Sequence, residues 1–256
     1  MTTVLVPLLS RKYPAPVPAL THRRALVTGA SRGIGRAIAL ALAGEGANLA
    51  LLARTSMATR DTAKAVRALG RESVSIGADL RDPAAVAAGI DKTIAALGGL
   101  DVMVHAAGLS WMGPSETAPA GAWSALMETN LVGAMEATRL ALPHLLKGTA
   151  PALIFIASIS AITPFARGAA YAASKHGILG FAQSLYEELR GAGLKISTIC
   201  PGNVNTEMTR STGLPARWDE LLQPEDVAEA VRYVLSTSPR ACPTEIVLRC
   251  HHGTYL

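Results

Sequence analysis

The chain has 256 residues, of which 50% are hydrophobic and 17% are charged. This composition excludes a disordered protein, and the length fits one large domain with an ample hydrophobic core. The net charge of +5 is scattered, with no dense basic run interleaved with aromatic residues, so nucleic-acid binding is not expected.

Residues 1–22 are predicted to form an extended or flexible N-terminal extension ahead of a domain over residues 23–256. The apolar stretch 4–9 is too short to span a membrane, and Arg11 and Lys12 follow it where a secretory signal would have its charges in front. Three alternating prolines favour an extended arm: Pro14, Pro16 and Pro18. No membrane partner is therefore expected.

A glycine-rich turn follows the first apolar run. The run Ala25-Leu26-Val27-Thr28 is of strand type, the turn reads Gly29-Ala30-Ser31-Arg32-Gly33-Ile34-Gly35, and a helix-forming segment comes next. Strand, glycine-rich turn and helix form the context that a phosphate-binding turn requires. The spacing is G-x-x-x-G-x-G, which differs from the best-known dinucleotide fingerprint. The amide groups at the start of such a helix attract a pyrophosphate.

Along the rest of the chain apolar runs alternate with helical patterns, which indicates βαβ units. We predict an α/β fold, a single-domain Rossmann-like doubly wound parallel sheet of about seven strands with helices on both faces. Strands are expected over 24–28, 48–53, 73–78, 101–106, 152–157, 195–200 and 245–248. Helices are expected over 34–45, 59–69, 83–97, 120–146, 169–190 and 224–235. Ligands of such sheets bind beyond the carboxyl ends of the strands.

The end of the second strand bears on the choice of nicotinamide cofactor. An acidic residue there favours NAD, but here Arg54 and Thr55 follow the strand. Arg32 and Ser31 of the glycine-rich turn can approach the same region, and two guanidinium groups suit a 2′-phosphate. We therefore expect NADPH to be preferred over NADH. The alternative is that both arginines are solvated turn residues.

Ser158, Tyr171 and Lys175 form a candidate carbonyl-reducing site. Tyr171 and Lys175 are four residues apart, so a helix places them on one face. An ammonium beside a phenol is expected to lower the phenol pKa from about 10, which makes Tyr171 a proton donor to a developing alkoxide. Ser158, after an apolar run, can hydrogen-bond the same oxygen. The alternative is an ordinary amphipathic helix with an exposed lysine and a half-buried tyrosine.

These motifs, with Ser158 thirteen residues before the Tyr171-x-x-x-Lys175 pair, resemble the short-chain dehydrogenase/reductase family over residues 24–248. The resemblance is to the NADPH-dependent carbonyl or ketone reductase type, and the core is similar to that of 3-oxoacyl-carrier-protein reductases. It implies four catalytic residues, with Asn130 supporting the lysine through a water: Asn130, Ser158, Tyr171 and Lys175.

The resemblance also implies the cofactor site. Asp79 and Leu80 match the pair that flanks the adenine, and residues 201–206 match the segment that embraces the nicotinamide. The predicted cofactor-binding residues are Gly29, Ser31, Arg32, Gly33, Ile34, Gly35, Arg54, Thr55, Asp79, Leu80, Ala107, Gly108, Tyr171, Lys175, Pro201, Gly202, Val204 and Thr206.

One segment departs from the family pattern. The usual N-N-A-G after the fourth strand is here His105-Ala106-Ala107-Gly108, so two side-chain amides are lost. His105 is interpreted as a buried or strand-end histidine rather than a catalytic residue, and replacement of one family asparagine by His105 is left open.

The substrate side is expected to be apolar. Residues 205–222 are predicted to form a mobile lid, because their Gly, Pro and Ser content favours a loop that closes on a ligand. The predicted substrate-pocket residues are Ser110, Trp111, Ile159, Phe165, Asn203, Met208, Leu214 and Trp218, although each could serve packing alone. Arg210 and Arg217 could meet a carboxylate or a carrier-protein phosphopantetheine, or could be solvated lid charges.

The predicted function is NADPH-dependent reduction of a ketone or aldehyde to an alcohol, with Tyr171 as general acid/base. Alternatives are an NADP(+)-linked secondary-alcohol dehydrogenase, a 3-oxoacyl-carrier-protein reductase, and a non-catalytic NADP(H)-binding regulator or scaffold. The C-terminal stretch 242–249 lacks the Gly-rich end of the acyl reductases, which favours a reductase of smaller carbonyls.

The expected partners are a small-molecule carbonyl substrate and further copies of the chain. The resemblance implies a homodimer or homotetramer through the helices over 120–146 and 169–190. Three widely spaced cysteines without a C-x-x-C pair favour reduced thiols and a cytoplasmic location. No metal is expected, because the adjacent His251 and His252 would point in different directions on an exposed tail.

Overall fold

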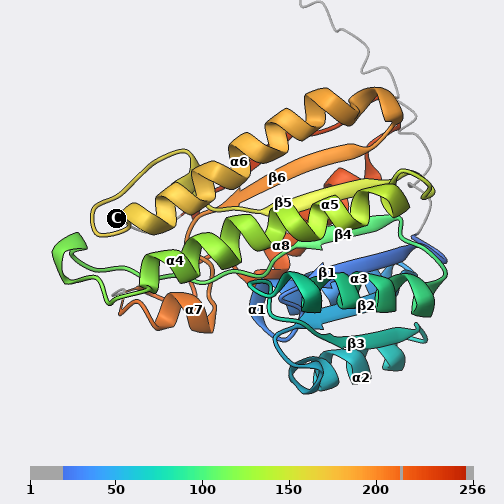
Figure 1. Ribbon diagram of the computed structural model, residues 1–256, viewed down its shortest axis with the longest axis horizontal. Coiled ribbons are helices and arrows are strands. Elements are labelled where there is room, and N and C mark those ends of the chain that lie inside the picture. Colours follow the sequence, from blue (N-terminus) through green and yellow to red (C-terminus); the bar gives the residue numbers. More distant parts are fainter. Residues whose placement is uncertain (1–19, 214–215, 252–256) are drawn as a thin grey trace, which may run out of the picture.

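A computed structural model describes residues 20–213 and 216–251 of the chain. Its strands form one parallel sheet in the order β3-β2-β1-β4-β5-β6-β7 (Figure 1), so the predicted doubly wound sheet is confirmed. The strands are β1 (Arg24–Thr28), β2 (Asn48–Ala53), β3 (Ser73–Gly77), β4 (Val102–His105), β5 (Ala152–Ile156), β6 (Lys195–Pro201) and β7 (Glu245–Leu248). Residues 1–19 of the predicted N-terminal extension 1–22 lie outside the described residues, as do Leu214 and His252.

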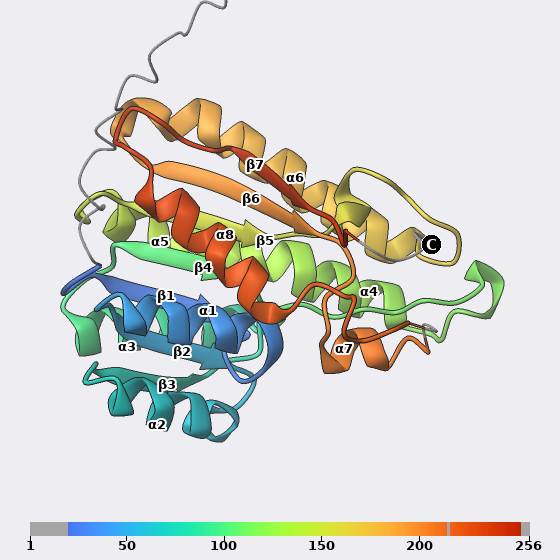
Figure 2. The same cartoon turned by 180° about the vertical axis from the view of Figure 1, so that it is seen from behind.

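Helices cover both faces of the sheet. The main helices are α1 (Gly33–Gly44), α2 (Arg60–Ala68), α3 (Pro83–Leu97), α4 (Ala122–Met127), α5 (Gly133–Leu145), α6 (Ala169–Leu189), α7 (Glu207–Arg210) and α8 (Pro224–Ser236). One buried cluster joins α1, α2 and α8 to the sheet (Figure 2), and a second joins α3, α5 and α6 to the other face (Figure 1). Short helical turns are η1 (Ser56–Thr59), η2 (Ser115–Thr117), η4 (Ile159–Ala161) and η5 (Arg190–Ala192).

The apolar runs of the sequence become strands because helices bury them on both sides. All four residues of β4 and all five of β5 are buried. The outermost strand β7 instead alternates exposed and partly buried residues. Continuous apolar runs are typical of the central strands of parallel sheets, whereas an edge strand keeps a mixed pattern.

Local signals fix the ends of α3. The Asp82 carboxylate accepts hydrogen bonds from the amides of Ala84 and Ala85 at 3.0 and 3.1 Å, and Pro83 occupies the first helical position. Gly98 closes the helix in the left-handed conformation at φ 72°. An Asp N-cap, a proline at the first position and a terminal glycine are the signals that stabilise helix ends.

The single helix predicted over 120–146 is interrupted. A π-helical turn, η3 (Glu128–Val132), separates α4 from α5. Immediately after it, a Cβ on Gly133 would come within 2.4 Å of the Leu80 carbonyl oxygen, so the helix lies very close to the loop after β3. Contacts with a distant loop are invisible in helical periodicity, and π-turns often occur at functional sites.

Asp101 ties together the amino ends of the central strands. Its carboxylate accepts three hydrogen bonds of 2.7–2.9 Å from the backbone and guanidinium of Arg24, and one of 2.7 Å from the Thr149 amide. Burial raises the pKa of Asp101, but these hydrogen bonds outweigh it and hold the pKa below its ordinary value. The buried carboxylate therefore stays ionised and links β1, β4 and the loop before β5.

We predict that Asp101→Ala lowers the free energy of unfolding by about 3 kcal/mol, because it leaves the half-buried Arg24 without its partner. Denaturant unfolding measures the change. Glu187→Gln is the control, since it breaks the exposed pair with Arg190 and should cost at most about 1 kcal/mol. Equal effects of the two substitutions would contradict this role for Asp101.

His105 at the end of β4 is a core residue. Its ring stacks on Phe155 of β5 with centroids 5.0 Å apart, and Nε2 lies 2.9 Å from the hydroxyl of Thr138 on α5. Burial lowers the pKa of His105 to about 3. The structure therefore agrees with the interpretation of a buried strand-end histidine, neutral at physiological pH.

The pKa of His105 is lower in the folded protein than in the unfolded chain. As the pH falls, the histidine of the unfolded chain is therefore protonated at a higher pH, and this protonation favours unfolding. We predict that the free energy of unfolding decreases between about pH 6 and pH 4, by up to about 1.4 kcal/mol per pH unit from His105 alone. His105→Asn should flatten this pH dependence of urea unfolding. The exposed His22, replaced by Asn, serves as control; equal slopes for all three proteins would show that His105 does not titrate in this way.

Candidate active site

The glycine-rich turn between β1 and α1 is shaped by residues that tolerate no side chain. Gly29 and Gly33 adopt positive φ values of 69° and 52°, which favour glycine. A Cβ on Gly35 would lie 2.3 Å from the Gly29 carbonyl oxygen. The turn therefore needs glycine at these three positions, and it leads directly into the amide groups at the start of α1.

The loop after β4 packs directly on this turn. A Cβ on Gly29 would lie 2.7 Å from the backbone nitrogen of Ala107. The Thr28 hydroxyl accepts hydrogen bonds from the amides of Ala106 and Ala107, both at 3.2 Å. The two segments that the sequence assigns to the cofactor are thus fixed against each other.

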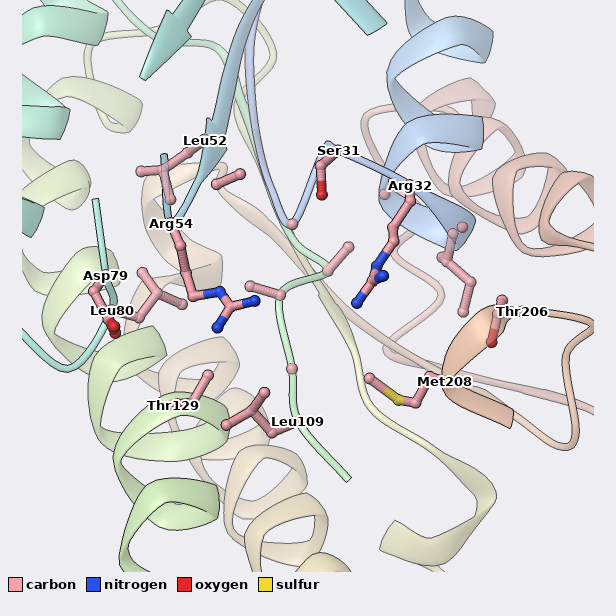
Figure 3. Close-up of a pocket in the computed structure, with 18 of the residues that line it drawn as sticks. Ser31, Arg32, Leu52, Arg54, Asp79, Leu80, Leu109, Thr129, Thr206 and Met208 are labelled. Atoms are coloured by element: carbon pink, nitrogen blue, oxygen red, sulfur yellow. The ribbon is translucent and has the colours of Figure 1, made fainter. Parts of the chain in front are cut away.

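A pocket of about 330 Å³ opens at this edge of the sheet (Figure 3). Predicted cofactor residues line it from five separate stretches of the chain: Gly29, Ser31, Arg32, Gly33, Ile34, Gly35, Arg54, Asp79, Leu80, Ala107, Gly108 and Thr206. The predicted substrate residue Met208 also lines this pocket. The pocket lining does not include the other predicted cofactor residues: Thr55, Tyr171, Lys175, Pro201, Gly202 and Val204.

The charged side chains of the pocket are largely paired. Asp79 accepts hydrogen bonds from Arg81, with a closest N–O distance of 2.7 Å, and these lower its pKa to about 2. Arg32 of the glycine-rich turn forms an ion pair with Glu207 of α7. Figure 3 shows Arg32 and Arg54 reaching into the pocket from opposite sides. The two arginines predicted for a 2′-phosphate therefore face one pocket, but Arg32 already has an anionic partner.

Ser158 and Tyr171 meet at the end of β5. Ser158 caps the η4 turn, where its hydroxyl accepts a hydrogen bond from the Ser160 amide at 3.1 Å and donates to the Ser160 hydroxyl at 3.0 Å. Burial raises the pKa of Tyr171 on α6, and its interaction with the Ser158 side chain opposes that rise. The pKa of Tyr171 therefore lies above its ordinary value and not below it as the sequence predicts. Tyr171 is therefore protonated at neutral pH.

Lys175 lies one helical turn beyond Tyr171 and is 6% exposed. Its Nζ donates a hydrogen bond to the Ile156 carbonyl at 3.1 Å and lies 5.8 Å from the centre of the Tyr171 ring. Burial lowers the pKa of Lys175 to about 8. The exposed lysine of the amphipathic-helix alternative is thus not observed.

Asn130 sits in the π-helical turn and connects three elements. Its Oδ1 accepts from the Leu109 amide at 2.7 Å, and its Nδ2 donates to the Leu109 carbonyl at 2.9 Å and to the Ser174 hydroxyl at 3.1 Å. Ser174 in turn donates to the Tyr171 carbonyl at 2.8 Å. The buried amide therefore holds the loop after β4 beside the helix that carries Tyr171 and Lys175.

Two loops on the predicted substrate side are linked to each other. The Gly113 amide donates to the Arg167 carbonyl at 2.8 Å. The Trp111 ring folds over Gly113 and the Phe165 ring folds over Gly168, since a Cβ on either glycine would meet the ring at 2.8 and 2.3 Å. Ser110 is half-buried in the first loop, and Ile159 begins η4.

The lid arginines are engaged within the lid. The Arg210 guanidinium lies 5.2 Å from the centre of the Trp218 ring and donates to the Asn205 side chain at 2.9 Å. Arg217 pairs with Glu220 at 2.7 Å. The backbone carbonyl of Asn203 accepts from the Leu222 amide at 3.2 Å, which closes the base of the lid. These contacts give Arg210 and Arg217 partners of their own.

Sequence reasoning missed several lining residues: Leu52, Ala53, Ala78, Arg81, Ala106, Thr129 and Glu207. Most are chain neighbours of predicted residues, so the motif boundaries could have been extended to include them. Glu207 lies between the predicted residues Thr206 and Met208, but its pairing with Arg32 could not be found from the sequence. Within the described residues no group of His, Cys, Asp and Glu could hold a metal ion, and no helix there is long and apolar enough to cross a membrane.

Comparisons with known proteins agree with this geometry. The family model for short chain dehydrogenase matches residues 23–215. The chain is 34% identical over 214 residues to the ketoacyl reductase HetN of Nostoc, covering 83% of this chain and 75% of that protein. A short chain dehydrogenase from Burkholderia cenocepacia, solved in complex with NADP, is 31% identical with a TM-score of 0.81, covering 90% of this chain and 97% of that one.

A short chain dehydrogenase from Mycobacterium paratuberculosis, solved bound to NAD, has the same fold with a TM-score of 0.82 at 26% identity. The similarity covers 90% of this chain and 97% of the Mycobacterium paratuberculosis chain. The structural relatives thus include proteins with either nicotinamide cofactor. On the family match, the sheet order and the identities, this chain belongs to the short-chain dehydrogenase family and is an oxidoreductase acting on CH–OH and C=O groups.

Proposed function

We propose that the protein reduces a ketone or aldehyde to an alcohol with NADPH, using Tyr171 as the general acid. The observation that carries this proposal is the buried Lys175 ammonium 5.8 Å from the centre of the Tyr171 ring, with the buried Ser158 side chain interacting with the same tyrosine. A non-catalytic protein that only binds the cofactor would have no need for a buried ammonium beside a phenol.

The residues of the pocket fit a nicotinamide dinucleotide. The glycine-rich turn carries no side chain at three positions. A ligand can therefore approach its backbone closely. The start of α1 offers amide groups to a pyrophosphate. Arg54, with no carboxylate at the end of β2, suits a 2′-phosphate. Asp79 and Leu80 are proposed to flank the adenine, and Pro201, Gly202, Val204 and Thr206 to border the nicotinamide.

When bound, the cofactor supplies the hydride that reduces the carbonyl carbon. Ser158 donates a hydrogen bond to the carbonyl oxygen, and Tyr171 transfers its hydroxyl proton to the developing alkoxide. Lys175, with a pKa of about 8, is mostly protonated at neutral pH and offsets the charge left on the phenolate. Asn130 holds the helix and the loop after β4 in register, and we assign to its turn the water that leads protons to solvent.

The reverse reaction, oxidation of a secondary alcohol with NADP(+), uses the same residues and depends on cofactor ratios. A 3-oxoacyl-carrier-protein reductase is the second candidate, which the similarity to the ketoacyl reductase HetN favours. Arg210 lies over the Trp218 ring and donates to Asn205 within the predicted lid, which weighs against its use for a carrier-protein anion. An uncharged, apolar carbonyl compound is the substrate class we propose.

We also propose a cytoplasmic homodimer or homotetramer. Trp123 on α4, Val132 in the π-turn and Met135 on α5 expose 44%, 55% and 39% of their surface, a pattern that suits a helical interface between copies. Cys200 and Cys242 form no disulfide within the described residues, an arrangement that suits a reducing compartment.

Tyr171→Phe should lower turnover by about 10²–10⁴-fold, because the general acid is lost. NADPH affinity should remain nearly unchanged. The measurement is NADPH oxidation against a panel of β-ketoacyl thioesters, β-ketoesters, α-diketones, quinones, cyclic ketones and aldehydes, together with NADPH binding by fluorescence. Tyr186→Phe, which removes a hydroxyl from the same helix outside the site, is the matched control. Unchanged turnover in Tyr171→Phe would refute the assignment.

Arg54→Ala should weaken NADPH binding by about 10- to 100-fold and leave NADH binding nearly unchanged, since a charge-assisted contact to the 2′-phosphate is lost. Equilibrium binding of both cofactors measures the ratio. Arg60→Ala removes an exposed arginine of α2 that does not line the pocket, and should change neither. Equal weakening of NADPH and NADH by Arg54→Ala would contradict recognition of the 2′-phosphate by Arg54.

A further inference from the structure

Glu207 places a negative charge inside the pocket that we assign to an anionic cofactor. It belongs to the first turn of α7, lines the pocket, and forms an ion pair with Arg32 of the glycine-rich turn. A carboxylate is an unexpected lining group in a pocket for phosphates, since like charges repel. Its partner Arg32 is one of the two guanidinium groups proposed to receive the 2′-phosphate.

The two elements that carry this pair are in direct contact. A Cβ on Gly33 would lie 3.3 Å from the Thr206 methyl group, so the glycine-rich turn touches the residue that precedes Glu207. The Thr206 hydroxyl caps α7 by accepting a hydrogen bond from the Thr209 amide at 3.3 Å. The carboxylate is therefore held beside Arg32 by a capped turn that packs against the phosphate-binding loop, and Met208 continues along the pocket wall (Figure 3).

The pair is weak enough for a phosphate to displace. The side chains of Arg32 and Glu207 are 65% and 70% exposed, and exposed pairs of this kind contribute a factor of about five or less to an equilibrium constant. A phosphate monoester carries nearly two negative charges and offers a planar guanidinium several acceptor oxygens, so it binds Arg more strongly than one carboxylate does. A ribose hydroxyl, as in NADH, offers no such competition.

We propose that Glu207 is a specificity-determining residue that competes with the 2′-phosphate of NADPH for Arg32 and thereby limits the preference for NADPH over NADH. The inference rests on the proposed function, because it takes the pocket to be the cofactor site. Binding of NADPH breaks the Arg32–Glu207 pair and leaves the Glu207 carboxylate to solvent, whereas binding of NADH leaves the pair intact.

The test is equilibrium binding of NADPH and NADH to the Glu207→Gln protein at low ionic strength, by nicotinamide fluorescence. Glutamine keeps the length and one acceptor oxygen, so Arg32 retains a neutral partner. We expect NADPH to bind about 3- to 5-fold more tightly and NADH to change less than about twofold. The gain should shrink as salt is added, because exposed charges are screened. Glu72→Gln makes the same charge change at an exposed residue outside the pocket and should alter neither affinity.

A second substitution separates competition from simple repulsion. In an Arg32→Ala background, Glu207→Gln should give a clearly smaller gain in NADPH affinity. Without Arg32, the carboxylate and the 2′-phosphate no longer compete for the same guanidinium. Weaker NADPH binding in Glu207→Gln would overturn the proposal, because it would mean that Glu207 holds Arg32 ready for the phosphate. An unchanged NADPH-to-NADH ratio would overturn it as well. If the unaltered protein binds neither cofactor, the proposed function fails too, which is a distinct result.

Discussion

The contact between the glycine-rich turn and the loop after β4 is the constraint on which the site depends. The Gly29 backbone lies against Ala107, and the Thr28 hydroxyl bonds the amides of Ala106 and Ala107. From there a continuous series of hydrogen bonds runs through Leu109, Asn130 and Ser174 to the backbone of Tyr171. The phosphate-binding loop and the proposed proton donor are thereby fixed relative to each other, although they lie far apart in the sequence.

Electrostatics divides this edge of the sheet into two environments. The pocket holds exposed charges in pairs, Asp79 with Arg81 and Arg32 with Glu207, which a bound anion can rearrange. Ser158 and Lys175 are buried and Tyr171 is partly buried, so desolvation raises the pKa of the phenol and lowers the pKa of the ammonium to about 8. Low-dielectric surroundings strengthen hydrogen bonds to a developing alkoxide. The exposed charge pairs of the pocket can exchange partners, and this exchange sets the affinity for the anionic cofactor.

Much of the fold could be predicted because its causes are local. Buried parallel strands require apolar runs, and the Asp82-Pro83 start of α3 is a helix signal in itself. The four-residue spacing of Tyr171 and Lys175 likewise places both on one helix face. The π-turn around Asn130 could not be predicted, because its neighbours come together only in the fold: the Leu109 backbone is hydrogen-bonded to Asn130, and the Leu80 carbonyl lies beside Gly133. The raised pKa of Tyr171 depends on burial, and the Arg32–Glu207 pair on loops that meet only in the fold.

The proposed function requires the cofactor pocket and the partly buried Tyr171 to serve one hydride transfer to a carbonyl. The most direct measurement follows deuterium from NADPH labelled on the transferable position of the nicotinamide ring. With a carbonyl compound that the protein turns over, we expect deuterium on the carbinol carbon of the alcohol product, in a single stereochemical configuration. Tight NADPH binding without transfer of label to any carbonyl compound would contradict it.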